Sequence, residues 1–326
     1  MEGYAKQTFL ALLNPYGTVV HTYPGIIDKV KPSIKKHGYA YYLGSKQTSM
    51  IPDSLIKRMG ENGFLQHTID RMSYGGRAVD MQLRSPLTGN LMTGSSSGTA
   101  LNVFYRINDI GIGSDGGGSV LAPAAALNLY GFISPMIEQE YLRQYEKVST
   151  DNIAFSPSLG LIGRSLDIIQ KAAACALDMD LPEAATEQLK IVGIPAFHKR
   201  LRLDIYEKRE VLIPFVKETV QRGTILLSKE GPVDFYGLGD SIFGHFSDRT
   251  WAIQKKSGKG LMRVANMCGV SALAIPEEDL GCCTLLLCDS NPQDIMNMLK
   301  AAENYVKPQN ALIDRYFGNF QMYFEG

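Results

Sequence analysis

The stretch TGSSSGTA (residues 93–100) is followed closely by a second run of small residues, GIGSDGGGS (residues 111–119). Ser119 ends the second run and stands 24 positions after Ser95 in the first. Glycine and serine carry little side chain, so loops of this composition bring the main chain close to another group. The pair of runs therefore predicts one site built from two neighbouring loops.

Composition limits the class of protein. The chain has 326 residues, of which 45% are apolar and 20% charged, enough to bury a large α/β core. Its 33 basic and 33 acidic residues balance, so no general electrostatic attraction to nucleic acid or to an anionic membrane is expected. The start, MEGYAKQTFLALLNPYG, lacks the combination of a basic start and a small-residue cleavage site that a secretory signal has. We expect a cytoplasmic protein.

Helical and strand patterns alternate along the chain, which favours a layered α/β fold. No internal repeat or low-complexity linker interrupts them, so a single domain is predicted over residues 1–326. Strands are expected at residues 38–46, 64–69, 189–197, 224–228 and 282–288. Helices are expected at residues 52–63 with Ser54 as cap, at 164–179 with Ser165 as cap, at 205–222 and at 290–306.

The segment of residues 116–137 is uncharged and long enough to suggest a membrane span. Pro123, Asn128, Gly131 and Pro135 interrupt it, so we predict a helix buried in a core instead. The five histidines show no HExxH spacing and the five cysteines form no CxxC pair. Neither a metal nor a disulfide is therefore expected.

The second run allows more than one chemistry. Gly111, Gly113 and Gly116 match GxGxxG, and Glu138 stands where a dinucleotide-binding site has an acidic residue. This signal is weak, because a dinucleotide loop opens a helix at once, whereas here further glycines and Pro123 follow. A phosphate-binding P-loop would need GxxxxGK[ST], which is absent.

A serine nucleophile is the third interpretation. Ser119 ends a glycine run, so its hydroxyl can be exposed while main-chain N–H groups converge on one point, as an oxyanion hole requires. The donors would be the N–H groups of Gly116, Gly117, Gly118 and Ser119.

A nucleophilic serine also needs a base, and no histidine lies near either loop in the sequence. The hydroxyls of Ser95, Ser96 and Ser97 could relay a proton. Lys46 ends the apolar strand YAYYLGS, and burial would lower the pKa of its ammonium group. Taken alone, Lys46 also fits an ordinary solvated lysine at the end of a strand.

The pair of loops resembles the amidase signature family, whose GGSSGG loop is followed at the same spacing by GTDxGGS. Further matches follow in order. They are LIKRMGENGFLQHTID (residues 55–70) with the family's segment ending in GAxxxGKTN, VLAPAAALNLYGF (residues 120–132) with IRxPAxxxGxxG, SPSLGLIGRSLDII (residues 156–169) with GPMARSVxD, and LMRVANMCGVSALAIP (residues 261–276) with NLAGxPAxSxP. The resemblance covers residues 38–326 and is weak over residues 1–37.

The resemblance implies a fold and a set of roles. The fold would be a mixed central β-sheet covered by helices on both faces. Ser119 would be the acylated nucleophile, Ser95 the bridging serine after a cis bond from Gly94, and Lys46 the base. Gly116, Gly117, Gly118 and Ser119 would form the oxyanion hole, and Ser96 and Asp115 would support the loops.

The implied activity is amide hydrolysis through an acyl-enzyme, on a small-molecule amide and without cofactor or metal. Neither nucleic acid nor a membrane is expected as a partner, and a homodimer is left open. An acyl transferase using the same acyl-enzyme is the alternative, and a non-catalytic binding protein comes third.

The chain departs from the family pattern at several positions. Leu121 replaces an arginine that would pair with Asp115, Ser97 replaces a glycine of the first loop, and His67 replaces the lysine of GAxxxGKTN. Only 49 residues separate Lys46 from Ser95, fewer than is usual in the family. For this reason Lys35 and Lys36 are kept as alternative bases.

Overall fold

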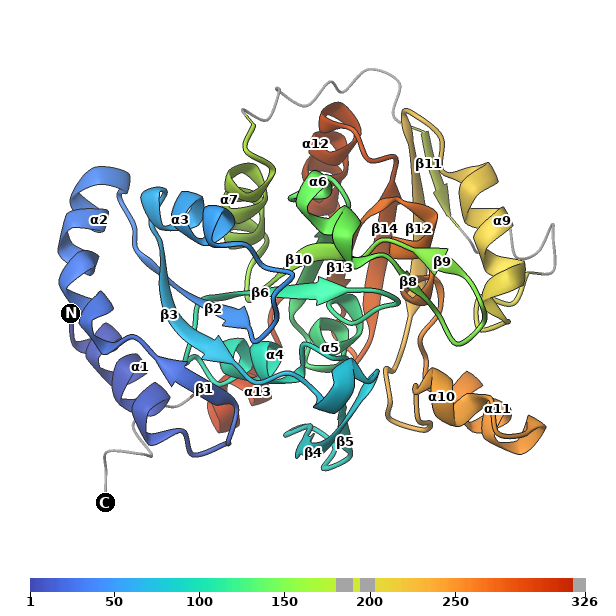
Figure 1. Cartoon of the computed structure of the whole chain (residues 1–326), viewed down its shortest axis with the longest axis horizontal. Helices are drawn as coiled ribbons and strands as arrows, with labels where there is room; N and C mark the ends of the chain where they lie inside the picture. The colour runs from blue at the N-terminus through green and yellow to red at the C-terminus, as the bar shows by residue number, and fades with distance from the viewer. Residues whose placement is uncertain (180–189, 194–202, 319–326) are drawn as a thin grey trace.

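A mixed sheet of ten strands runs through the molecule (Figure 1). The computed structural model describes residues 1–179, 190–193 and 203–318. In spatial order the strands are β1 (Val19–Thr22), β3 (Phe64–Asp70), β2 (Tyr41–Lys46), β6 (Ile110–Asp115), β10 (Ser158–Gly163), β7 (Tyr130–Ser134), β13 (Ser271–Pro276), β14 (Cys283–Cys288), β12 (Thr224–Glu230) and β11 (Lys190–Gly193). The β2–β3, β2–β6 and β11–β12 pairs are parallel and the other pairs antiparallel. The predicted mixed α/β sheet is confirmed.

Helices and two short hairpins surround this sheet. The α-helices are α1 (Glu2–Leu13), α2 (Val30–His37), α3 (Asp53–Glu61), α4 (Ser97–Phe104), α5 (Leu121–Ala126), α6 (Gln139–Leu142), α7 (Leu166–Leu177), α9 (Arg209–Thr219), α10 (Ser241–Gly244), α11 (Asp248–Lys255), α12 (Pro292–Ala301) and α13 (Ala311–Phe317). The hairpins are β4 (Val79–Arg84) with β5 (Leu91–Thr93) and β8 (Lys147–Val148) with β9 (Ala154–Phe155).

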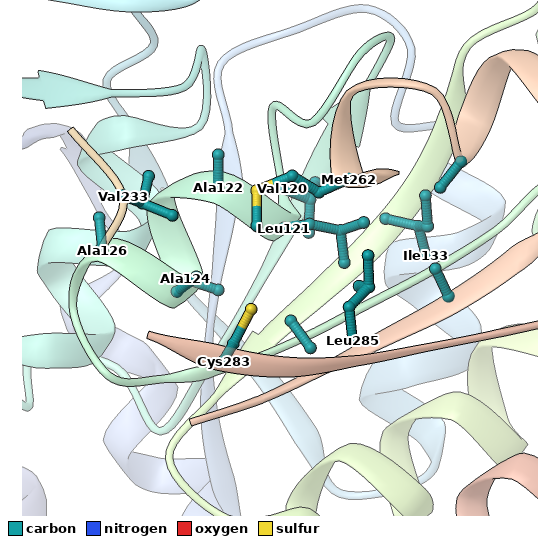
Figure 2. Packing of buried hydrophobic residues seen from close by; sticks show 14 of the residues in the cluster. Val120, Leu121, Ala122, Ala124, Ala126, Ile133, Val233, Met262, Cys283 and Leu285 are labelled. Carbon is teal, nitrogen blue, oxygen red and sulfur yellow. The ribbon is translucent and has the colours of Figure 1, made fainter. Parts of the chain in front are cut away.

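Both faces of the sheet are buried at its central strands β6, β10, β7 and β14. Successive side chains of a strand point to opposite faces, so neighbouring residues join different clusters. In β14, Leu285 joins the hydrophobic cluster that contains α5, whereas Leu286 joins the cluster that contains α7 and α12. Figure 2 shows the first cluster, with Leu121 and Ala124 of α5 above Leu285. Burial on both faces explains why this strand is a continuous apolar run in the sequence.

Most of the predicted elements are present with shifted ends. Ser165 caps α7 as predicted, its side chain accepting a hydrogen bond from the Ile168 N–H. The predicted cap at Ser54 is wrong, because α3 already begins at Asp53 and Pro52 precedes it without a side-chain cap. The helix expected over residues 205–222 begins only at residue 209. Residues 190–193 of the strand predicted at residues 189–197 form β11, and residues 189 and 194–197 lie outside the described part.

The single buried helix predicted over residues 116–137 is also wrong. The segment forms a short helix, α5, and then a buried strand, β7. Pro123 stands in the first turn of α5, where its missing N–H costs little, and Asn128 turns the chain with a left-handed φ of 52°. Within the described ranges, no helix has both the length and the apolar character needed to cross a membrane.

Candidate active site

Lys46 ends β2 and is buried, with a side chain directed at the first of the two small-residue loops. Its Nζ donates to Ser95 Oγ at 2.7 Å. It also donates to Ser114 Oγ at 2.9 Å and to the Ser114 carbonyl at 3.4 Å. The alternative bases Lys35 and Lys36 lie on the exposed last turn of α2. Of the three candidate lysines, only Lys46 contacts the loop.

Burial changes the proton affinity of this lysine. Loss of solvation lowers the pKa of Lys46 to about 7, and the nearby Asp115 carboxylate opposes this shift only in part. A substantial fraction of Lys46 is therefore neutral near pH 7. In that state the amine has a lone pair that can accept a proton.

Ser114 is a member of this group that the sequence did not single out. It lies on β6, next to Asp115, and is buried. Its hydroxyl and carbonyl together accept two of the hydrogen-bond donors of Lys46. The only available signal was its position in the second run, between Gly113 and Asp115.

The two loops lie against each other as the spacing predicted. The Ser96 N–H donates to the Ser119 carbonyl at 3.3 Å. Gly94 has a φ of +78°, and a Cβ at this position would lie 2.5 Å from Cδ of Pro123. Only glycine allows this conformation and this close approach.

The cis peptide bond expected between Gly94 and Ser95 is not found. Among the described residues, the bond between Gly231 and Pro232 is the only cis peptide, so the Gly94–Ser95 bond is trans. The positive φ of Gly94 reverses the chain at this point, and Ser95 reaches Lys46 with a trans bond.

Asp115 holds the second loop through its main chain. Its carboxylate accepts hydrogen bonds from the N–H groups of Gly117 at 3.0 Å, Gly118 at 2.7 Å and Val120 at 2.7 Å. Leu121, at the position of the family arginine, is fully buried in the core. Main-chain donors therefore supply the contacts of Asp115 where the arginine is missing.

This arrangement bears on the four predicted oxyanion donors. The N–H groups of Gly117 and Gly118 are directed to Asp115. Those of Gly116 and Ser119 make no hydrogen bond to any residue in the described part of the chain. The half-buried Ser119 hydroxyl also has no hydrogen-bond partner within the described ranges. The predicted oxyanion hole and the Ser95–Ser119 contact stay predictions.

The remaining serines of the first run have different surroundings. Among the residues that the structure describes, the Ser96 hydroxyl makes only a long contact of 3.5 Å to the Ser114 carbonyl. Ser97, which replaces a family glycine, donates to the buried carboxylate of Asp80 at 2.7 Å. Its hydroxyl therefore contributes to local structure and points to a group outside the lysine cluster.

Two other sequence interpretations can be compared with the structure. Gly111 and Gly113 lie within β6, so the GxGxxG match is not a strand-to-helix turn, and Glu138 pairs with Arg58 at 2.6 Å.

His67 is buried beside Tyr42, and burial lowers its pKa to about 4. It is a neutral packing residue on β3.

Comparison with known proteins agrees with this geometry. Residues 84–136, which contain both loops, match the family model described as Amidase. A bacterial aryl acylamidase of the amidase signature family superposes with a TM-score of 0.62 at 14% identity, covering 97% of this chain and 94% of that one. A 6-aminohexanoate cyclic dimer hydrolase gives 0.61 at 12% identity, with coverages of 96% and 95%. The native peptide amidase of Stenotrophomonas maltophilia gives 0.58 at 14% identity, with coverages of 93% and 93%.

No curated protein sequence matches the chain significantly. The structural likeness, at such low identity, is a likeness of fold. The chain therefore has the fold of amidase signature enzymes, and residues 84–136, which hold both loops, are similar to the Amidase family. The same match supports amide hydrolysis as the general activity.

Proposed function

We propose that the chain is a serine-dependent amide hydrolase that works through an acyl-enzyme on Ser119. The observation that carries this proposal is the 2.7 Å contact between Nζ of Lys46 and Oγ of Ser95, made by a lysine whose pKa is lowered to about 7. Such a lysine can act as a base near neutral pH, whereas an ordinary lysine cannot.

The proton path follows from the hydrogen bonds of Lys46. As a neutral amine it keeps two N–H donors, which suit the hydroxyl and carbonyl of Ser114. Its lone pair then faces Ser95, which can pass on the proton of Ser119. The Ser119 oxygen attacks the amide carbon as this proton moves to Lys46.

The tetrahedral intermediate needs donors for its oxygen. The N–H groups of Gly116 and Ser119 are the best candidates, because Asp115 uses those of Gly117 and Gly118. Collapse of the intermediate breaks the C–N bond, and the proton returns through Ser95 to the leaving nitrogen. Water then cleaves the acyl-enzyme by the same route.

Labelling with a fluorophosphonate probe, followed by mass mapping, tests the proposal. Phosphonylation of Ser119 is expected in the wild type and is expected to disappear in Lys46→Ala. An unlabelled wild type, under conditions that label a control serine hydrolase, would contradict the proposal. Ammonia release from a panel of primary amides then tests hydrolysis, and diversion of the acyl group to an added amine would indicate a transferase.

A binding protein without turnover is the second candidate. The observation that favours it is that the Ser119 hydroxyl makes no hydrogen bond to Ser95 within the described residues. The missing contact does not by itself exclude catalysis, because catalytic hydrogen bonds often shorten when substrate binds. Labelling of Ser119 would show an activated nucleophile and so reject this candidate.

A further inference from the structure

The β8–β9 hairpin links the two sides of the candidate site. Just before β8, the hydroxyl of Tyr145 donates to the carbonyl of Ser49 at 2.7 Å, and Ser49 follows Lys46 by three residues. In β9, Phe155 contacts Gly116, which precedes Ser119 by three residues. The hairpin therefore runs from the loop after the candidate base to the loop that ends at the candidate nucleophile.

Phe155 packs directly on the glycine loop. A Cβ placed on Gly116 would lie 2.8 Å from Cε2 and 3.2 Å from Cζ of the Phe155 ring. The ring thus occupies the place where a side chain at position 116 would stand. Phe155 is only partly buried, so part of its surface stays open beside the loop. An apolar group held next to Gly116 could cover that open part.

The pairing of the hairpin shows which residue shares a face with Phe155. Lys147 stands directly opposite Phe155, and Val148 stands opposite Ala154. Directly opposed residues of an antiparallel pair place their side chains on the same face, and successive residues alternate between faces. Lys147 therefore lies on the face that meets the glycine loop. Val148 lies on the other face and is 66% exposed.

The charge of Lys147 acts on the candidate base, as this orientation requires. Burial is the main cause of the lowered pKa of Lys46. The Asp115 carboxylate opposes the shift, and the Lys147 ammonium adds to it. Lys147 is exposed, so solvent screens its charge in part. The electrostatic effect and the contact of Phe155 agree that one face of the hairpin is turned toward the site.

Buried side chains hold the hairpin in this position at both ends. At its turn, Asp151 Oδ2 accepts a hydrogen bond from Arg209 Nη1 at 2.7 Å. After β9, the carbonyl of Ser156 accepts one from Asn266 Nδ2 at 3.0 Å. Both Arg209 and Asn266 are buried. The ring of Phe155 is therefore fixed before any ligand binds, which reduces the entropy cost of a contact with it.

We propose that the Phe155 ring contacts the substrate beside the scissile amide, and that the enzyme therefore prefers amides with an aromatic or other large apolar group at that point. The inference rests on the proposed function, because attack by Ser119 fixes where the amide must lie. A ring that is open on one side and packed on the other gains from covering by an apolar group, and most from another ring.

Substrate preference tests the contact. Ammonia release gives kcat/KM for benzamide and phenylacetamide, with acetamide and propanamide as small aliphatic references. The wild type should prefer at least one aromatic amide by about tenfold or more, and Phe155→Ala should reduce this preference by about tenfold. A wild type without the preference would overturn the inference. So would a Phe155→Ala variant that loses activity equally on all four amides, as a merely structural role predicts, or that keeps or increases the preference.

Two further variants control for folding and for position. Val148→Ala removes an apolar side chain from the other face of the same hairpin and should leave the preference unchanged. An equal reduction in Val148→Ala would count against a specific contact of Phe155. Phe155→Leu keeps an apolar side chain against Gly116 but removes the ring. Should Phe155→Ala not fold, Phe155→Leu decides, with a reduced preference expected and the wild-type preference contradicting the contact.

Binding without turnover separates failure of this inference from failure of the proposed function. Ser119→Ala cannot form an acyl-enzyme, so ligand-observed NMR titrations can measure its Kd for benzamide and acetamide. Benzamide should bind about tenfold more tightly, and adding Phe155→Ala should remove the difference. An unchanged difference contradicts the inference.

The combined outcomes are distinct. Cleavage of amides without an aromatic preference overturns the inference and leaves the hydrolase proposal intact. Absence of all cleavage and of Ser119 labelling contradicts the hydrolase proposal. In that case the NMR titrations still decide whether Phe155 contacts a bound amide.

Discussion

Nζ of Lys46 and Oγ of Ser95 lie 2.7 Å apart, although 49 residues separate them in the sequence. Lys46 ends β2, which pairs with β6. Ser114 of β6 accepts a second hydrogen bond from the Lys46 amine. The contact joins a strand end to a loop that the sheet topology alone would not connect. Its chemical consequences can be measured.

The rate should depend on pH through Lys46. Its pKa in the folded protein is lowered to about 7, so the amine is protonated and inactive as a base below that pH. We expect kcat/KM, or the rate of Ser119 labelling, to rise with pH and to reach half its plateau near pH 7. Measurement from about pH 5 to 9 checks this. A flat wild-type profile would exclude Lys46 as the titrating base.

The same shift predicts a pH dependence of stability. The unfolded chain, with an ordinary lysine pKa of 10.5, binds more protons than the folded chain between about pH 7 and 10.5. The contribution of Lys46 to the free energy of unfolding should therefore become more favourable as pH rises through this window. Urea denaturation of wild type and Lys46→Met at both ends of the window measures it. The difference between the two proteins should change with pH, and a constant difference contradicts the assignment.

Ser114 should act as a positioning residue for Lys46. Ser114→Ala removes the hydroxyl that accepts from Nζ at 2.9 Å, so kcat should fall by about tenfold with little change in KM. Loss of this acceptor disfavours the charged amine, so the rising limb of the pH profile should also move to lower pH. Ser114→Thr, which keeps the hydroxyl, should restore both. Wild-type kinetics in Ser114→Ala would refute the role.

Asp115 should stabilise the loop of Ser119. Asp115→Asn cannot accept all three main-chain N–H groups as the carboxylate does, so the free energy of unfolding should fall by about 1–3 kcal/mol. Labelling of Ser119 should slow as well. Asp28→Asn, at an exposed position, is the control and should leave both quantities unchanged. Equal stability of the two variants would show that the loop does not depend on Asp115.

Gly94 should tolerate no side chain. Gly94→Ala combines a φ of +78° with a Cβ 2.5 Å from Pro123, and we expect a loss of stability above about 1–2 kcal/mol. Gly17→Ala is the matched control, because its φ of +65° carries the same backbone strain but nothing lies within 4 Å of the new Cβ. The two free energies of unfolding, measured in urea, separate strain from collision. Equal losses would mean that the close approach of the loops has no energetic weight.

Local pattern was sufficient for much of the fold. Ser165 and the apolar spacing after it define α7, and the apolar run of β14 marks a strand buried on both faces. These features depend on neighbours in the sequence. The prediction for residues 116–137 was wrong because hydrophobic periodicity cannot distinguish a long buried helix from a short helix followed by a buried strand in an uncharged apolar segment.

The sequence by itself determined which residues could take part in the site, because the small residues of the two loops and their 24-residue spacing are written in the chain. Only the tertiary structure decided the partners. Burial of Lys46 lowers its pKa, Ser114 holds its amine, and the Gly94–Ser95 peptide bond is trans. Solvation and contact geometry are properties of the packed chain, and no local pattern encodes them.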